Sequence, residues 1–348
     1  MNFPHSISLT ITNHCNLRCR MCGQWSEEGY VRRNTESLKH EMALADWKRV
    51  VDELAVHNIK SLLLRGGETF MFPSIVDLLE YIHAMGIFIS IDTNGTLLKQ
   101  FAEDIVRIGN MHLTISVDGP EPVHDAVRGL PGTFQRVKEG VKRLIELEAD
   151  SDNKISKSIC FTISQFNYHS LGMMPDVARS LGLGSIAIVP YYYFPGSTGH
   201  QYEDELRNLG CNAFSWTGFH HEDSGVDFNK FQRQYHLYLA NLRDIYSYPY
   251  MPLNEEQYRD WFADTKKTVG PPHCLNIENL IDIQPDGSVN FCVDFVDYSF
   301  GNVREASIEN LWNGERAERF RQYRREHPLA VCSRCGAKFM SQAWSDYG

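Results

Sequence analysis

The sequence lacks the features of several protein classes. None of its apolar runs approaches the ~20 residues that a transmembrane helix needs. Its start, MNFPHSISLT, has neither a basic segment nor a continuous apolar stretch, so it does not resemble a signal peptide. The net charge of −10 excludes a generally basic surface for nucleic acid. We therefore expect a cytoplasmic protein with no membrane partner and no nucleic-acid partner.

What is present is an ordinary globular composition with nine cysteines. The 348 residues are 43% hydrophobic and 22% charged, enough for one large or two modest domains with a buried core. Secreted domains use many cysteines as disulfides. Without a signal peptide, spaced cysteines more often bind metal or take part in chemistry. The odd count also argues against complete pairing.

The first 190 residues alternate strand-like and helix-like segments. Strict alternation predicts right-handed βαβ units and a parallel sheet. Six such units form an incomplete version of the eightfold barrel, whose sites lie at the C-terminal ends of the strands. The predicted fold class is α/β, a partial (βα)6 TIM-like barrel followed by a small C-terminal α+β domain. The predicted strands are 7–12, 61–65, 87–92, 112–118, 158–164 and 185–191, and the predicted helices are 42–57, 74–85, 99–109, 133–148 and 170–181.

Two of the predicted strands, 112–118 and 158–164, alternate apolar and polar residues. Successive side chains of a strand point to opposite faces of the sheet. The apolar sets should therefore meet the helices, and the polar sets, which include Ser116 and Cys160, should line the lumen. Half-exposed antiparallel strands are the alternative, and the intervening helices disfavour it.

We expect three parts: a barrel over 1–190, an aromatic-rich segment over 191–270, and a C-terminal domain over 271–348. The middle segment should cover the barrel mouth and help form the substrate pocket. Its rings suit a peptide or the face of a sugar, although they could simply pack a helical bridge. The last part shows two short strands around Pro285-Asp286-Gly287 and a helix near 307–326.

Three cysteines, Cys15, Cys19 and Cys22, directly follow the first predicted strand. Soft thiolate ligands select zinc or iron–sulfur. Cubane clusters usually take four cysteines, so a set of three leaves one iron open for a substrate or cofactor. The alternative is a zinc knuckle completed by His14.

The C-x3-C-x2-C spacing resembles that of the radical S-adenosylmethionine (radical SAM) superfamily. Gly66-Gly67-Glu68 follows the second strand, and the other matching residues come in the family's order. Met21 and Thr69 depart from residues frequent in the family. The resemblance implies that the open iron chelates S-adenosylmethionine (AdoMet) and that one electron cleaves AdoMet to a 5′-deoxyadenosyl radical, which takes hydrogen from the substrate. The residues it implies for AdoMet binding are Gly66, Gly67, Glu68, Asn94, Ser116, Asp118 and Arg128.

The second cysteine group is Cys274, Cys292, Cys332 and Cys335. The first two flank a predicted hairpin, and four thiolates could close a zinc site. Their order resembles instead the C-terminal auxiliary-cluster domain of radical SAM enzymes, called SPASM. Ser341 stands where the next SPASM cysteine would fall. The chain therefore resembles the shortened twitch version, which implies a single further [4Fe–4S] cluster, two in all, and an electron-transfer role.

Two cysteines, Cys160 and Cys211, lie outside both groups. A thiol near a substrate radical could return a hydrogen atom, and we consider Cys211 first and Cys160 second as such catalytic residues. The alternative is that each is a small buried hydrophobe. The adjacent His220 and His221 are more typical of a surface loop than of a metal site.

The expected protein is thus a radical SAM enzyme of the oxidoreductase or epimerase type. One hypothesis is crosslinking or epimerisation of a peptide. The other is dehydrogenation or epimerisation of a small alcohol or sugar. Either reaction would need a low-potential electron donor such as flavodoxin or ferredoxin. A non-redox, zinc-bound scaffold is the alternative from another class.

Overall fold

The chain folds around one curved sheet. The computed structural model describes residues 3–265, 267–271 and 273–339, and within these the sheet has ten strands in the order β10-β9-β8-β1-β2-β3-β4-β5-β6-β7. Strands β1 to β7 pair in parallel, each with the next along the chain. The six predicted strands are confirmed. They are β1 (Ser6–Thr12), β2 (Ser61–Gly66), β3 (Phe88–Thr93), β4 (Met111–Ser116), β5 (Ser156–Ile163) and β6 (Ser185–Pro190).

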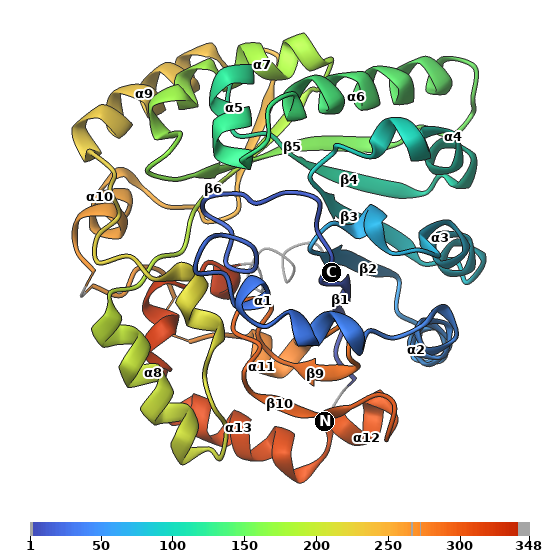
Figure 1. Cartoon of the computed structure of the whole chain (residues 1–348), viewed down its shortest axis with the longest axis vertical. Helices are drawn as coiled ribbons and strands as arrows, with labels where there is room; N and C mark the ends of the chain where they lie inside the picture. The colour runs from blue at the N-terminus through green and yellow to red at the C-terminus, as the bar shows by residue number, and fades with distance from the viewer. Residues whose placement is uncertain (1–2, 266, 272, 340–348) are drawn as a thin grey trace.

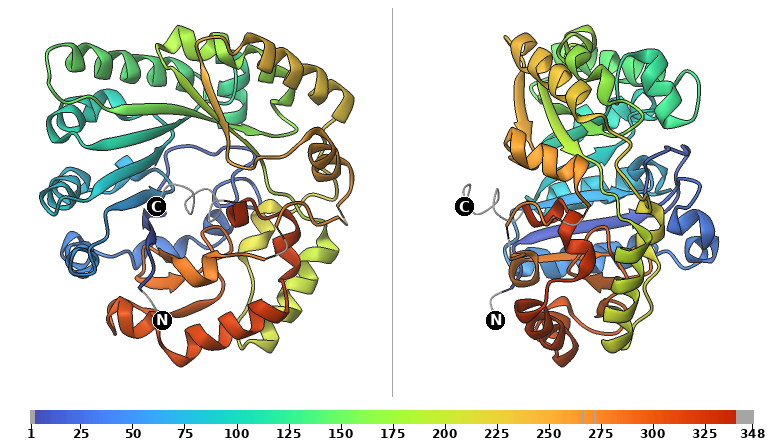
Figure 2. Two further views of the ribbon diagram at one scale, coloured as in Figure 1. Left: turned by 180° about the vertical axis from the view of Figure 1, so that it is seen from behind. Right: turned by 90° about the vertical axis from the view of Figure 1, so that its left-hand side faces the viewer.

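Helices cover the outer face of this sheet (Figures 1 and 2), and a cavity lies on its inner face. All five predicted helices are present, as α2 (Leu44–Val56), α3 (Ile75–Ala84), α4 (Leu98–Ile108), α6 (Thr133–Ala149) and α7 (Met174–Leu181). The short helix α1 (Tyr30–Arg33) lies in the loop after β1, and α5 (Glu121–Arg128) lies after β4. The architecture is the expected α/β partial barrel.

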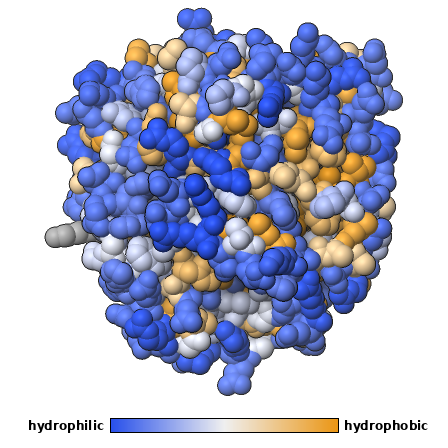
Figure 3. All heavy atoms as spheres, viewed as in Figure 1, coloured by the Kyte–Doolittle hydropathy of each residue, from blue (hydrophilic) through white to orange (hydrophobic). Residues whose placement is uncertain are grey.

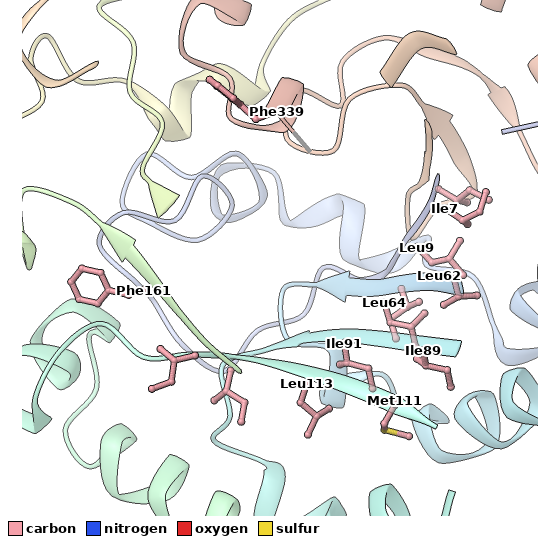
Figure 4. Close-up of a cluster of buried hydrophobic side chains, with 14 of the residues drawn as sticks. Ile7, Leu9, Leu62, Leu64, Ile89, Ile91, Met111, Leu113, Phe161 and Phe339 are labelled. Carbon is pink, nitrogen blue, oxygen red and sulfur yellow. The ribbon is translucent and has the colours of Figure 1, made fainter. Parts of the chain in front are cut away.

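The apolar face of the strands forms the main core with the helices. Figure 4 shows side chains such as Leu64, Ile91 and Leu113 lying on the helix side of β2, β3 and β4, and these three are fully buried. The alternate residues face the other way, since Thr114 and Cys160 line a cavity in the lumen. The prediction from the two-residue period is therefore confirmed for β4 and β5.

Residues 191–270 contain a strand that the sequence analysis did not predict. β7 (Tyr246–Pro249) pairs in parallel with β6, so the barrel has a seventh strand. It is short and at most half-buried, and it therefore shows no apolar alternation. The helices of this segment are α8 (Gly196–Asn208), α9 (Phe228–Asn241) and α10 (Glu255–Ala263).

The C-terminal strands extend the barrel sheet rather than forming a separate one. β8 (Leu280–Ile283) pairs in parallel with β1, while β9 (Ser288–Asn290) and β10 (Ser299–Asn302) follow antiparallel. The predicted hairpin is present, and Gly287 turns it with a φ of 89°. The helices of this part are α11 (Asn276–Asn279), α12 (Ile308–Trp312) and α13 (Glu315–Glu326). Ser341 lies outside the described residues.

The face of the molecule in Figure 3 is mostly hydrophilic, with apolar side chains in scattered groups. Within the described part of the chain, the helices are all too short or too polar to cross a membrane.

Candidate active site and cluster sites

The loop after β1 carries the first cysteine group across the centre of the ring of strands (Figure 1). Cys15 and Cys22 pack against one small apolar cluster around Trp25. The backbone N–H of Leu17 donates to Cys15 Sγ at 3.5 Å, and that of Trp25 donates to Cys22 Sγ at 3.4 Å. Such bonds stabilise thiolate ligands and tune iron–sulfur clusters.

Burial raises the pKa of the Cys15 thiol to about 12 and that of the Cys19 thiol to about 11. Coordination to a metal offsets this, because a ligating thiol is deprotonated outright. Among the described residues, no three His, Cys, Asp or Glu side chains converge on a point that one metal ion could occupy. A cubane binds each thiolate at a different iron atom, so three spaced thiols fit a cluster better than a zinc knuckle.

The Gly66-Gly67-Glu68 segment lies directly against the backbone that leads into the first cysteine group. The N–H groups of Gly67 and Glu68 donate to the carbonyls of Thr12 and His14, each at 2.8 Å. A Cβ atom at Gly67 would clash with the His14 carbonyl oxygen. Glycine is therefore required here for the close approach of two backbone segments.

Glu68 is almost fully buried and ties the ends of β2 and β3 together. Its carboxylate accepts from the Thr93 hydroxyl at 2.7 Å, the Asn94 N–H at 2.7 Å and the Phe70 N–H at 3.2 Å. The Asn94 side chain in turn donates to Asn16 Oδ1, inside the first cysteine loop, at 2.9 Å. A carboxylate has about four acceptor positions, so one is left for a ligand such as an ammonium group.

Arg128, at the end of α5, connects two of the predicted site residues. Its guanidinium forms a buried ion pair with Asp118 at 2.6 Å and donates to Cys19 Sγ at 3.6 Å. Burial raises the pKa of the Asp118 carboxyl, and Arg128 opposes that rise. The pair thus places a positive charge beside the first cysteine group and neutralises it with a carboxylate.

The second cysteine group also comes together in space. Cys274, Cys292, Cys332 and Cys335 line one internal cavity, which is otherwise mostly apolar. Burial raises the pKa values of the Cys274, Cys292 and Cys335 thiols. Four thiols around one enclosed space fit the ligand number of a [4Fe–4S] cluster.

A cavity of about 290 Å³ in the barrel lumen is lined by sequence neighbours of cysteines from both groups. At one end lie Met21, between two cysteines of the first group, and Ser116. At the other end lie Val293, Asp294 and Gly336, which adjoin Cys292 and Cys335. Tyr191, Tyr192, Phe219, Tyr250 and Met251 also line this cavity, all from the segment 191–270.

Arg65 lines the cavity and links β2 to the segment after Cys292. From β2 it donates to the Val293 carbonyl at 3.2 Å and pairs with the Asp294 carboxylate at 3.1 Å. Asp92, on β3, also lines the cavity, and burial raises the pKa of its carboxyl. The cavity is therefore lined by two acidic residues, Asp92 and Asp294, and by one cation, Arg65, which is already paired with Asp294.

The two remaining cysteines separate in the structure. Cys160 lines the cavity, and burial raises the pKa of its thiol to about 12, which keeps the S–H protonated. Cys211 lies elsewhere, beyond the end of α8, where its Sγ accepts from Arg316 at 3.4 Å. Of these two cysteines, only Cys160 is placed to meet a substrate in the cavity.

Four charged residues line the two cavities without being marked by any sequence motif: Arg65, Asp92, Asp294 and Arg324. The alternation of β3 gives a signal for Asp92, because Ile89 and Ile91 are buried against the helices. No comparable signal marks Arg324, one of several arginines in a charged helix.

The residues 9–171 match the family described as the radical SAM superfamily, and residues 274–336 match SPASM, described as an iron–sulfur cluster-binding domain. The chain belongs to the radical SAM superfamily. It is a radical SAM enzyme with a C-terminal SPASM-like domain. Its cofactors are accordingly AdoMet with a [4Fe–4S] cluster in the first domain, and iron–sulfur in the second.

Individual relatives of this radical SAM enzyme are distant. The AdoMet-dependent heme synthase of Methanosarcina barkeri (strain Fusaro / DSM 804) is 25% identical over 343 residues, 96% of this chain and 88% of that protein. The antilisterial bacteriocin subtilosin biosynthesis protein AlbA of Bacillus subtilis (strain 168) is 22% identical over 327 residues, 89% of this chain and 60% of that protein. The structure of Streptococcus suis SuiB has a TM-score of 0.66 at 14% identity, covering 96% of this chain and 72% of that chain. This last likeness shows the shared fold.

Proposed function

We propose that this radical SAM enzyme removes two electrons and two hydrogens from a carbon centre of a peptide side chain. The observation that carries the proposal is one cavity lined by Met21, next to Cys22, and by Val293 and Gly336, next to Cys292 and Cys335. The residues proposed to hold the first cluster are Cys15, Cys19 and Cys22, and those proposed for the second are Cys274, Cys292, Cys332 and Cys335.

A substrate in the cavity lies between two different acceptors. When bound, AdoMet and the first cluster supply a radical that takes a hydrogen atom. Val293 and Gly336 also line the cavity and adjoin Cys292 and Cys335, which would hold the second cluster, and that cluster would supply an acceptor for the remaining electron. Loss of a hydrogen atom, an electron and a proton completes a two-electron oxidation of the substrate. The first cluster would be recharged by a low-potential donor such as flavodoxin or ferredoxin.

The charge of the cavity indicates the substrate class. Arg65 is the only cation among the described lining residues and is paired with Asp294, while Asp92 adds a second carboxylate. A tetrapyrrole with several carboxylates, as the heme synthase relatives would suggest, would find no unpaired cation there. A neutral or cationic side chain of a peptide fits both the charge and the volume. SuiB, which shares the fold, has been solved with a precursor peptide.

We also propose that residues 191–270 cover the barrel mouth and grip the substrate, with 1–190 as the barrel and 271–348 as the auxiliary-cluster domain. Five residues of the middle segment line the cavity, and Tyr192 and Phe219 lie with ring centroids 5.9 Å apart. Aromatic rings of this kind provide flat apolar surface with polar edges.

The test incubates anaerobically reconstituted enzyme with AdoMet, dithionite and short peptides that present serine, cysteine, threonine or lysine. We expect peptide-dependent formation of 5′-deoxyadenosine and a peptide product lighter by two hydrogens. Coproporphyrin serves as the competing substrate. If the porphyrin stimulates AdoMet cleavage and no peptide does, the proposed substrate class is wrong.

Epimerisation is the second candidate, and the placement of Cys160 favours it. A protonated thiol in the cavity could return a hydrogen atom to the substrate. In that case the product keeps its mass in H₂O and gains one solvent deuterium in D₂O. Cys160→Ala should then still cleave AdoMet but give no epimer, whereas Cys211→Ala should behave like wild type. For an oxidation, no deuterium enters at the reacting carbon and both variants stay active.

A further inference from the structure

Two buried cations line the cavity of the second cysteine group. Arg324, on α13, is 8% exposed, and Lys338 is 3% exposed. Both line the same cavity as the four cysteines. Arg324 interacts electrostatically with Cys332, Cys292 and Cys274 as well as Cys335.

Arg324 lacks a carboxylate counter-ion. Its Nη1 donates to the His327 carbonyl at 3.0 Å. Its buried Nε–H has no hydrogen-bond partner, and no ion pair involving Arg324 occurs among the described residues. Burying an unpaired charge is strongly unfavourable. Among the described residues, the four cysteines and the group they would hold are the negative charge that faces Arg324.

The first cysteine group differs in this respect. Arg128 approaches Cys19, but its charge is offset by Asp118 at 2.6 Å. The second group faces Arg324 without such an offset. Asp294 is the one carboxylate among the described residues that line that cavity, and it is paired with Arg65.

We propose that Arg324, together with Lys338, is the counter-ion of the auxiliary [4Fe–4S] cluster and raises its reduction potential. A [4Fe–4S] cluster with four thiolate ligands carries net negative charge, and one-electron reduction adds another. Cations buried beside it stabilise the reduced form more than the oxidised form. The step is the uptake of one electron, with no bond made or broken.

This inference rests on the proposed function only for the source of that electron, the substrate radical. A raised reduction potential favours transfer of the electron from the substrate radical to the second cluster. The two cations are held by the fold itself, since Arg324 is buried on α13 and Lys338 is buried in the segment after Cys335.

The test isolates the auxiliary cluster by replacing Cys15, Cys19 and Cys22 with alanine. In that background, redox titration followed by electron paramagnetic resonance compares wild type with Arg324→Gln and Lys338→Gln. Arg325→Gln is the matched control, because Arg325 lies on the same helix, is 46% exposed and pairs with Glu278. We expect each cavity variant to weaken reduction at least tenfold, a shift of about 59 mV toward negative potential for one electron. The control should stay unchanged.

Unchanged potentials in cavity variants with full iron content would overturn the proposal. If Arg324→Gln loses the cluster, Arg324→Lys decides. If Arg324→Lys retains iron and has a potential near that of wild type, the charge of Arg324 has the proposed role. If Arg324→Lys also loses iron, the proposal is overturned, because the side chain then acts through packing alone. Product formation is measured in the same variants with Cys15, Cys19 and Cys22 intact. A lowered potential with undiminished product formation leaves the counter-ion role standing and refutes the auxiliary cluster as the substrate's electron acceptor.

Discussion

At the scale of single residues, the Arg128–Asp118 pair gives the sharpest prediction. Both side chains are buried, and their charges lie 2.6 Å apart. Removing one partner of a buried pair leaves an uncompensated charge, which typically costs about 3–5 kcal/mol. We therefore expect Arg128→Ala to lower the free energy of unfolding by about that amount, as measured by urea denaturation of the apo chain.

Arg136→Ala is a control for Arg128→Ala, because Arg136 is exposed on the neighbouring helix α6. It should change the free energy of unfolding by less than about 0.5 kcal/mol. Arg128→Ala should also bind AdoMet about ten- to hundredfold more weakly, if Arg128 contacts the cofactor as the resemblance implies. Equal stability of the two variants would contradict the ion-pair account.

Gly67 allows a second prediction at this scale. A Cβ atom there meets the carbonyl oxygens of Asn13 and His14, in the segment that leads into Cys15. Gly67→Ala should therefore displace the first cysteine loop and leave about four irons per chain after anaerobic reconstitution, from the second cluster alone. Gly184→Ala is the control, because a Cβ atom at Gly184 meets open space. Full iron content in Gly67→Ala would show that the loop tolerates the shift.

The sequence motifs indicate the proposed ligand residues but not the charged residues that lie near them. Spaced cysteines and glycine motifs are local, so their order along the chain is visible without a structure. Arg65 and Arg324 act through contacts with Asp294 and the second cysteine group, and these partners are far away in sequence. An isolated arginine in a sequence is more often a solvated surface charge, and only the fold shows which ones are buried.

At the scale of elements, burial decided which strands could be predicted. β1 to β6 are mostly buried and rich in branched residues, and they lie between amphipathic helices. β7 has exposed and half-exposed tyrosines and joins the sheet through backbone pairing with β6. Edge pairing of this kind depends on the neighbouring strand and leaves no periodic pattern. The pairing of β8 with β1 is likewise a long-range contact.

The β1–β8 junction gives a pH prediction. Asp282, on β8, is fully buried, and burial raises the pKa of its carboxyl from 3.8 to about 6. Because the folded pKa exceeds the unfolded one, this contribution to stability is fully present below about pH 4 and is lost as the pH rises through about 6. Between pH 4 and pH 7, the free energy of unfolding of wild type should therefore fall by about 3 kcal/mol relative to that of Asp282→Asn.

Urea denaturation across this pH range measures the Asp282 effect, with Asp152→Asn as the control. Asp152 is exposed in the loop between α6 and β5. Its variant should follow the wild-type pH profile. Parallel profiles for wild type and Asp282→Asn would mean that Asp282 stays ionised, compensated by Arg65.

At the scale of the whole molecule, the two cysteine groups lie in separate segments beside one sheet, and the second group lines a cavity of its own. The first group follows β1, and the second surrounds the segment after β9, with Arg65 as the link through Val293 and Asp294. This arrangement predicts that each cluster assembles without the other. Reconstituted wild type should hold about eight irons per chain, and the Cys15/Cys19/Cys22→Ala variant about four. That variant should also lose all reductive cleavage of AdoMet.

The reciprocal variant completes this prediction. Cys274/Cys292/Cys332/Cys335→Ala should hold about four irons and still cleave AdoMet slowly, because the first group keeps its own N–H donors from Leu17 and Trp25. It should form no oxidised product, since the substrate radical then has no acceptor for its electron. Iron and sulfide analysis with detection of 5′-deoxyadenosine measures both effects. Stoichiometric zinc in the second group of anaerobically prepared wild type would contradict two clusters, and loss of both clusters in either variant would show that they assemble as one unit.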